Sequence, residues 1–485
     1  MRDYLKFYIG GSWVDPTTDR QIEIINPATE AVAGHISLGE NADVHAAVLA
    51  ARAAFPAFAA TSKEDRLSLL HSIALRYEER KADVAAAISE EMGAPNWLAI
   101  EAQAALGSGH LAVAIATLEN YSFEEPSGTT LVVKEPIGVC AFITPWNWPI
   151  NQIACKVLPA LAVGCTMILK PSEIAPFSAQ IWTEILHEAG VPPGVFNLVH
   201  GVGSEVGAAL ARHPNVDMVS FTGSTPAGVA VAREAADTVK RVHQELGGKS
   251  PNIVLPDANV EEAVAQGIKA AMLNTGQSCN APTRLLVPAN RSTEAIEVAR
   301  GAAEQMTVGP PEMNATMGPV ISKRHWEKIQ NLIQTGIDEG ATLVTGGLGL
   351  PDGLQTGYYV RPTVFSEVTP QMTIAREEIF GPVVSIMSYN DEEEAVAIAN
   401  DTAYGLAAYV QSGNLEHARS FMRRIRAGQV FLNYADLDLA APFGGYKQSG
   451  NGREWGKWAF DEFVEIKAVM GYSMRAFTPH ELVSV

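Results

Sequence analysis

Apolar residues recur at helical spacing in two stretches near the start of the chain. Val44, Val48 and Ala51 fall on one face of a helix that opens at Asn41, a residue type favoured at the N-cap. The run Ser62-Lys-Glu-Asp65 has the pattern of a capping box and opens a second helix. The first part of the chain is therefore predicted to be largely helical.

From residue 137 onward, short apolar runs alternate with helical patterns. Helices are predicted at 95–120, 150–163, 178–189 and 203–212, and buried strands at 137–143, 166–170, 196–199 and 218–222. A second alternation of strands and helices runs from about 250 to 435. Because strands that alternate with helices form right-handed βαβ units, the predicted fold class is α/β with parallel sheets. The chain shows no low-complexity linker, so the domains are expected to pack together.

Length and composition restrict the classes of function. A chain of 485 residues predicts two or three domains, and 47% hydrophobic residues supply their cores. The 35 basic and 54 acidic residues give a formal charge of −19, which argues against nucleic acid or an anionic membrane as partner. Four cysteines favour free thiols in a reducing compartment. The N-terminus lacks a secretion signal, and the most apolar stretch, 153–169, is interrupted by Lys156 and Pro159, so a cytoplasmic location is predicted.

A cysteine and a glutamate stand out in two glycine-containing turns. Cys279 lies in Asn274-Thr-Gly-Gln-Ser-Cys279-Asn280, among polar residues that suit a cleft better than a core. Glu245 opens the turn Glu245-Leu-Gly-Gly-Lys-Ser-Pro251, directly after a predicted strand. A lone cysteine is more often a small buried side chain, and a lone glutamate is more often a solvated one. Together they favour covalent chemistry at the thiol followed by activation of water at the carboxylate.

Two further motifs complete a recognisable set. They are Pro145-Trp-Asn147-Trp-Pro149 and Glu377-Glu378-Ile-Phe380-Gly-Pro382. With the turns of Cys279 and Glu245, in this order and spacing, they resemble the NAD(P)-dependent aldehyde dehydrogenase family, non-acylating branch. The resemblance extends from about residue 5 to about residue 470.

The resemblance implies a specific architecture. A Rossmann-type NAD-binding domain would comprise residues 1–117 and 137–247, and an α/β catalytic domain residues 248–448. A β-hairpin at 118–136, with its turn at 126–128, would join the C-terminal segment 463–485 in an oligomerisation arm. Since exposed strand edges invite pairing with another chain, a homodimer or homotetramer is expected.

The resemblance also assigns the catalytic roles. Cys279 would attack the aldehyde carbon to form a thiohemiacetal, and the side-chain amide of Asn147 would hold the developing oxyanion with the backbone N–H of Cys279. Glu245 would then direct water at the thioester. Lys156 is included in the catalytic set, and no catalytic metal is expected because no metal-ligand spacing is present.

The cofactor site implied by the resemblance is built mainly at strand ends. Its candidate residues are Trp146, Lys170, Ser172, Glu173, Gly203, Phe221, Gly223, Ser224, Leu246, Glu378 and Phe380. The free N–H groups where 221–228 opens a helix would favour the pyrophosphate, whereas the spacing Gly-x-Gly-x-x-x-Gly at 201–207 favours a packing role. Glu173 would repel a 2′-phosphate and thus predicts NAD, with NADP as the alternative.

The substrate is expected to be a neutral aromatic or aliphatic aldehyde. The candidate contact residues are Trp148, Asn151, Cys155, Leu437 and Phe443. Asp436 and Asp438 stand in the expected anchoring loop, where an arginine would suit a carboxylate-bearing substrate. Two alternatives stay open at this point: a coenzyme A-acylating dehydrogenase, which Glu245 argues against, and a non-catalytic binding protein on the same fold.

Overall fold

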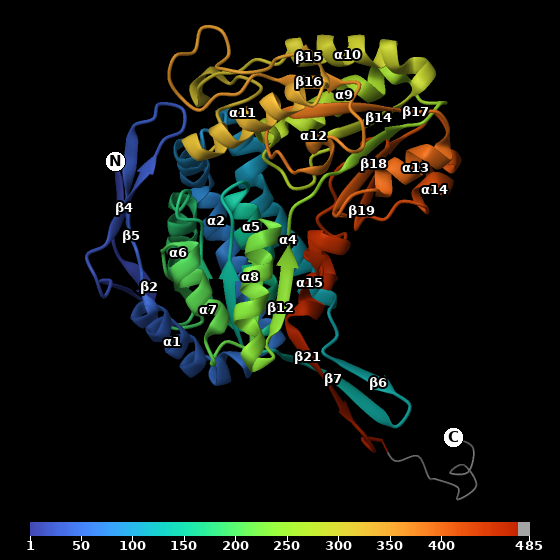
Figure 1. Cartoon of the computed structure of the whole chain (residues 1–485). Helices are drawn as coiled ribbons and strands as arrows, with labels where there is room; N and C mark the ends of the chain where they lie inside the picture. Colours follow the sequence, from blue (N-terminus) through green and yellow to red (C-terminus); the bar gives the residue numbers. More distant parts are fainter. Residues whose placement is uncertain (474–485) are drawn as a thin grey trace, which may run out of the picture.

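A computed structural model describes residues 1–473 and shows two α/β lobes with a projecting arm (Figure 1). The first lobe is built on an eight-stranded sheet of order β20-β12-β11-β8-β9-β10-β2-β3. Its strands are β2 Phe7–Ile9, β3 Ser12–Val14, β8 Val139–Ile143, β9 Thr166–Lys170, β10 Phe196–Leu198, β11 Met218–Thr222, β12 Arg241–Glu245 and β20 Gly450–Asn451. The five central strands, from β12 to β10, are parallel, which confirms the predicted fold class.

Helices cover both faces of this first sheet. They are α1 Asn41–Ala59, α2 Lys63–Met92, α3 Asn96–Leu98, α4 Ala105–Asn120, α5 Pro149–Val163, α6 Phe177–Glu188, α7 Ala208–Arg212 and α8 Thr225–Ala235. Alternate residues of β8 enter opposite cores, because successive side chains of a strand point to opposite faces. Cys140 and Phe142 pack with α2, α4, α5 and α6, whereas Val139 and Ala141 pack with α1 and α7.

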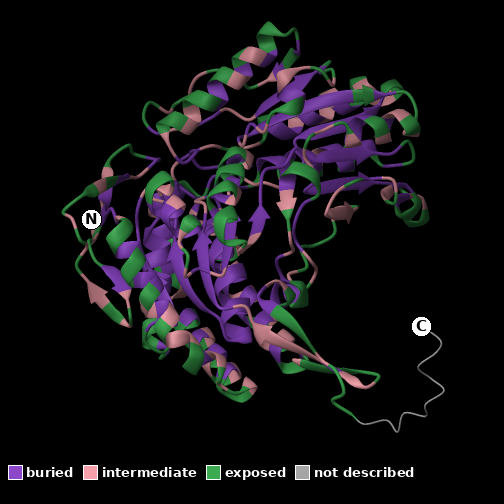
Figure 2. Cartoon of the chain, turned by 60° about the horizontal axis from the view of Figure 1, so that its bottom comes forward, coloured by how far each residue is buried: buried purple, intermediate pink, exposed green. Residues whose placement is uncertain are grey.

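The second lobe contains a seven-stranded sheet of order β15-β16-β17-β14-β13-β18-β19. Its strands are β13 Pro251–Val254, β14 Arg284–Pro288, β15 Thr342–Thr345, β16 Thr363–Ser366, β17 Val383–Tyr389, β18 Ala407–Gln411 and β19 Gln429–Leu432. Its helices are α9 Val260–Met272, α10 Ser292–Glu304, α11 Lys323–Asp338, α12 Thr373–Arg376, α13 Glu392–Asn400 and α14 Leu415–Met422. Only β15 runs antiparallel to its neighbour. Figure 2 shows that the central strands of both large sheets are mostly buried, whereas β3, β15, β19 and β20 at the sheet edges are partly exposed.

Two small sheets complete the fold. One has the order β1-β5-β4, from β1 Arg2–Tyr4, β4 Gln21–Ile25 and β5 Val32–Ser37. The other is the projecting arm, in which β6 Glu124–Ser127 and β21 Val464–Val469 flank β7 Thr130–Pro136 (Figure 1). Helix α15 Gly456–Glu462 precedes β21. Residues 474–485 of the predicted arm segment 463–485 lie outside the described residues.

Three local predictions need correction. The N-cap of α1 is Glu40, and its capping partner is Asp43, so Asn41 is already the first helical residue. The hairpin turns at Gly128, whose φ is +62°, because Pro126 belongs to strand β6. Within residues 1–473, the helical stretch Asn96–Asn120, and not 153–169, is the one long and apolar enough to cross a membrane by length and composition. Its α4 portion packs against α2 and α5 as a core helix does.

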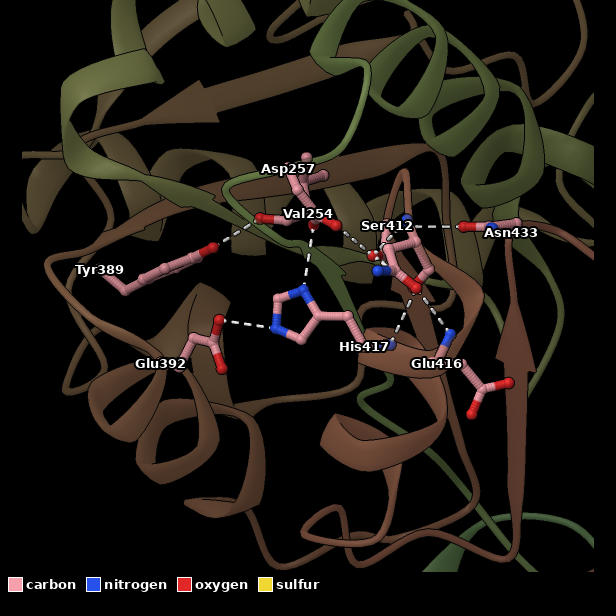
Figure 3. Close-up of polar contacts among 9 residues, drawn as sticks. Val254, Asp257, Tyr389, Glu392, Ser412, Glu416, His417 and Asn433 are labelled. Atoms are coloured by element: carbon pink, nitrogen blue, oxygen red, sulfur yellow. Dashed lines mark hydrogen bonds and ion pairs between the residues drawn. The ribbon is translucent and has the colours of Figure 1, made fainter.

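A polar network ties the helices of the second lobe together (Figure 3). His417 of α14 lies 3.3 Å from an Asp257 carboxylate oxygen and 2.8 Å from Glu392 of α13. The Ser412 hydroxyl donates to the Asp257 carboxylate at 2.8 Å. The backbone N–H of Ser412 donates to the Asn433 side chain at 2.9 Å. One imidazole thus joins two carboxylates from two other segments.

Candidate active site

The candidate residues of the first lobe gather where its sheet changes direction. From β8 the chain adds β9 and β10 on one side and then β11 and β12 on the other. Crevices form at the carboxyl ends of strands at such a switch point. Here Trp146 follows β8, Gly223 and Ser224 follow β11, and Leu246 follows β12. These residues line a cavity of about 200 Å³ that also contains Cys279.

The loop that carries Cys279 has an unusual backbone. Asn274, Thr275 and Gly276 all have positive φ, at 54°, 58° and 72°. A Cβ on Gly276 would lie 2.2 Å from the carbonyl oxygen of Gly381, so only glycine fits there. Non-glycine residues with positive φ store strain and cluster at functional sites. The turn directs the half-buried Cys279 into the space between the lobes.

Glu245 ends β12 and lines the same cavity as Cys279. Burial, followed by the Glu454 charge, raises the pKa of Glu245 well above its usual value, and its Oε1 has no partner within residues 1–473. Burial and the neighbouring Glu245 also raise the pKa of the Cys279 thiol well above its usual value. The raised pKa values favour the protonated forms of both groups, so Glu245 must lose its proton before it can act as a base.

Asn147 is held in place from three sides. Its backbone oxygen accepts from the side-chain amides of Asn274, at 2.8 Å, and Gln103, at 3.1 Å. Its own Nδ2 donates to the backbone oxygen of Gln277 at 3.1 Å. The next residue, Trp148, donates from Nε1 to the Ser278 hydroxyl at 2.8 Å. These hydrogen bonds hold the Asn147 and Cys279 loops together. The sequence does not predict the role of Gln103, because this residue lies in a helical turn at 99–104 and belongs to no motif.

Behind these groups lies a buried ion pair. Lys156 of α5 lies 2.5 Å from Glu454 and donates to the Thr222 hydroxyl at 2.7 Å. Although burial opposes it, the Cys155 and Glu454 charges raise the pKa of Lys156. Burial likewise opposes ionisation of Glu454, but the Lys156 ammonium keeps the pKa of that carboxyl below its usual value. Glu454 is absent from the predicted site residues, and only its place after the glycine-rich run 444–452 hints at it.

The wall of the cavity opposite β8 comes from the second lobe. Phe380, at a φ of 61°, places its ring 5.5 Å from that of Trp146, and His325 lies 5.4 Å from the same indole. Glu378 accepts a 2.9 Å bond from the N–H of Gly248. A Cβ on Gly247 would lie 2.5 Å from the Glu378 carboxylate, so the glycine permits this close approach. His325 and Lys328 line the cavity but were not among the predicted residues.

A second group of predicted cofactor residues lies at the end of β9. The Lys170 ammonium lies 2.8 Å from Glu173, which also accepts a 3.4 Å bond from the N–H of Gly203. Although burial opposes it, Lys170 keeps the pKa of Glu173 below its usual value. Ser172 is buried beside them. These four residues are brought together, but they lie outside the lining of the 200 Å³ cavity, as does Phe221, which is buried against Gly223.

The residues present suit a dinucleotide. Helix α8 begins at the switch point with Ser224 as N-cap, and its free N–H groups and dipole favour an anion. The carboxylates of Glu173 and Glu378 offer acceptors for the hydroxyls of the two riboses of such a ligand. Within residues 1–473, no group of three or more His, Cys, Asp or Glu side chains is arranged to hold a metal ion.

A second cavity, of about 350 Å³, opens on the other side of Cys279. Aromatic and aliphatic side chains dominate its lining, which includes Leu106, Trp148, Leu273, Tyr409, Phe431, Tyr434, Leu437, Phe443 and Trp455. Its polar members are Asn151, Gln152, Ser278, Asn280 and Asp436, and Asp438 is not in its lining. Cys155 lies behind this wall, packed against Phe443 and Trp455, and lines a separate, smaller cavity.

Comparisons with known proteins match nearly the whole chain. The sequence model described as Aldehyde dehydrogenase family matches residues 13–469. A Pseudomonas protein named 3-succinoylsemialdehyde-pyridine dehydrogenase is 58% identical over 474 residues, which cover 97% of this chain and 99% of that protein.

Solved structures are similarly close. Aldehyde dehydrogenase C from Pseudomonas syringae, a cysteine-to-alanine mutant with NAD+ and octanal, superposes with a TM-score of 0.96 at 52% identity and covers 97% of this chain and 98% of its own. Betaine aldehyde dehydrogenase from Staphylococcus aureus, with NAD+, has a TM-score of 0.93 at 34% identity, covering 98% and 97%.

Proposed function

The chain belongs to the aldehyde dehydrogenase family, and from this premise we propose that it oxidises a neutral aldehyde to the carboxylic acid through a thioester on Cys279. One observation carries the proposal. Cys279 lines both the cavity at the strand ends and the apolar cavity, and it is the one residue that their linings share among those the structure describes.

The cofactor is NAD. The Pseudomonas syringae and Staphylococcus aureus structures contain NAD+, and the strand-end cavity of this chain has the groups that a dinucleotide needs. When bound, NAD accepts the hydride of the oxidation. Lys170, Ser172 and Glu173 would hold the adenosine side, Ser224 and Gly223 the pyrophosphate, and Glu378 the nicotinamide ribose, with Phe380 and Trp146 enclosing it.

The first step is addition of the Cys279 thiolate to the aldehyde carbon. Since the pKa of the thiol is raised, the proton must first pass to a base, and Glu245 is the neighbouring carboxyl. The carbonyl oxygen would become an oxyanion held by the side-chain amide of Asn147, whose Nδ2 is oriented by its bond to the Gln277 backbone oxygen. Loss of one such donor typically costs about 10²–10³ in turnover.

The second step is hydrolysis of the thioester. After releasing the thiol proton to solvent, Glu245 takes a proton from water, whose oxygen adds to the acyl carbon, and the Cys279 sulfur leaves as the thiolate. The buried Lys156–Glu454 pair stands behind Glu245 and tunes its charge. A carboxyl in this position favours release of a free acid over transfer to coenzyme A, so the acylating alternative is not favoured.

The apolar cavity suits an aldehyde with a long or aromatic body. Its lining contains no lysine or arginine, and Asp436 would repel a carboxylate tail. The names of the relatives point the same way: one includes a pyridine ring and another structure contains octanal. Trp148, Leu437 and Phe443 would contact the body of the substrate, while Cys155 would support Phe443 from behind.

The arm supports assembly into a homodimer or homotetramer. Its outer strands, β6 and β21, leave backbone edges free, and Ile466 and Met470 expose apolar side chains on it. The domains would then comprise residues 1–117 with 137–247, and 248–448, with the arm at 118–136 and from 463 on. We place this enzyme in the cytoplasm, where its four free thiols would stay reduced.

Rapid-mixing assays of NADH formation test the mechanism. Cys279→Ala should abolish oxidation and keep NAD binding. Glu245→Gln should give a burst of NADH followed by turnover about 10²–10⁴ slower, because hydrolysis loses its base. Cys165→Ala removes a buried thiol far from the cavities and serves as the control. Normal turnover by the Cys279 variant would refute the nucleophile, and absence of a burst with full steady-state turnover would refute the base.

A further inference from the structure

A histidine and an asparagine form a buried pair in the wall of the apolar cavity. Nε2 of His110, on α4, lies 2.7 Å from Oδ1 of Asn151, on α5. The two residues are 4% and 8% exposed, so neither exchanges this contact for water. Asn151 lines the cavity, whereas His110 stands behind it. The mechanism on Cys279 gives neither residue a task.

The amide orientation in the structure, with Oδ1 of Asn151 facing Nε2 of His110, sets the tautomer of the ring. Burial lowers the pKa of His110 to about 4, so the imidazole is neutral at physiological pH. Oδ1 of an amide can only accept, so Nε2 carries the ring proton and donates it. This leaves the Nδ2 protons of Asn151 without a partner among residues 1–473. Because Asn151 lines the cavity, these protons are available to a ligand that can accept a hydrogen bond from them.

Neighbouring aromatic rings hold the histidine in place. The His110 ring lies 5.7 Å from that of Trp455 in an edge-on arrangement, and Trp455 stacks on Phe443 at 4.4 Å. Both aromatic residues line the same cavity. The imidazole therefore cannot turn freely, and the amide that it holds is fixed relative to the substrate body.

We propose that Asn151, positioned by His110, selects aldehydes that carry a hydrogen-bond acceptor, such as a ketone carbonyl, along their apolar body. The proposal rests on the proposed function and names its substrate class. The cavity wall would bind the aryl or alkyl part, and the Asn151 amide would donate to the acceptor. The name of the Pseudomonas relative, with its succinoylsemialdehyde and pyridine, belongs to this class.

A matched pair of aldehydes tests it. 4-Oxo-4-phenylbutanal and 4-phenylbutanal share their carbon skeleton and differ in one ketone. The ratio of their kcat/KM values is measured for the native enzyme and for Asn151→Leu, His110→Phe and Leu437→Ala. Asn151→Leu should lower the ratio by roughly tenfold, mostly through KM, as expected for one lost hydrogen bond. His110→Phe keeps the ring packing but removes the N–H, and should lower the ratio by a smaller factor.

If a variant is partly unfolded, both kcat/KM values fall by the same factor, so their ratio, measured on one preparation, is unaffected. Leu437→Ala changes the apolar wall for both aldehydes, so it should leave the ratio within about twofold of the native value. A native ratio in Asn151→Leu would overturn the proposal, and a native ratio in His110→Phe would remove His110 as the positioning residue. If the native enzyme oxidised neither aldehyde with NAD, the proposed function itself would fail.

Discussion

Nζ of Lys156 lies 2.5 Å from Oε1 of Glu454, although 298 residues separate them in the sequence, and both side chains are buried. The pair links α5 to the segment that precedes α15, directly behind Glu245 and Cys155. A buried ion pair is weak evidence for net stability, but breaking it leaves one charge uncompensated. Removing one partner of the pair should therefore destabilise the protein more than removing both.

Lys156→Met should destabilise the protein by about 3–5 kcal/mol, because Glu454 would remain buried without its counter-charge. The double variant Lys156→Met/Glu454→Leu should recover much of that loss, since no charge is then left in the core. Denaturant unfolding followed by fluorescence measures both. Equal destabilisation of the single and double variants would show that the pair is not the cause.

The reactivity of Cys279 should rise with pH in the enzyme without cofactor. Burial and Glu245 raise the pKa of the thiol, so little thiolate is present at neutral pH and its fraction grows as the pH increases. Glu245→Gln removes the neighbouring negative charge and should move the midpoint of iodoacetamide labelling to lower pH. Mass spectrometry of the labelled peptide separates Cys279 from the three buried cysteines. A midpoint that stays unchanged in Glu245→Gln would exclude this coupling.

Cofactor choice should depend on Glu173. Glu173→Gln removes the carboxylate expected to repel a 2′-phosphate and leaves Lys170 without its partner at 2.8 Å. We expect kcat/KM with NADP to rise by roughly tenfold, since about 1.4 kcal/mol of lost repulsion is a factor of ten. Glu205→Gln removes one negative charge from the exposed Arg20 pair and is the control for total charge. An equal gain in both variants would assign the effect to net charge alone.

The His417 network should make stability depend on pH. Although burial opposes it, Asp257 and Glu392 raise the pKa of His417 above its ordinary value of 6.5. The charged imidazole therefore stabilises the fold below pH 6.5, and this contribution is lost as the pH rises through the raised pKa. His417→Asn should remove that part of the pH dependence. Unfolding midpoints of both proteins between pH 6 and pH 9 provide the test, and parallel curves would contradict it.

Strand ends and linear motifs were predictable from the sequence because their signals are local. The apolar runs located β8, β9, β10 and β11, and the parallel topology then placed the residues after them at one edge. Glu454, Gln103 and His110 were missed, because each acts through a contact with a distant segment that no spacing reveals. The N-cap of α1 was misplaced by one residue, since a Glu40–Asp43 box can replace the commoner asparagine cap.

Among the residues that the structure describes, Cys279 alone lines both cavities, and this arrangement has a kinetic consequence. With the proposed assignment of the cavities, cofactor and aldehyde would reach the sulfur through different walls, so neither ligand would have to leave before the other arrives. At a saturating concentration of NAD, the KM for the aldehyde should still be measurable, and the same should hold for NAD at saturating aldehyde. Neither ligand should inhibit the other competitively. The carboxylic acid can also depart through the apolar cavity while the reduced dinucleotide is still bound, so the order of product release is set by two independent exits.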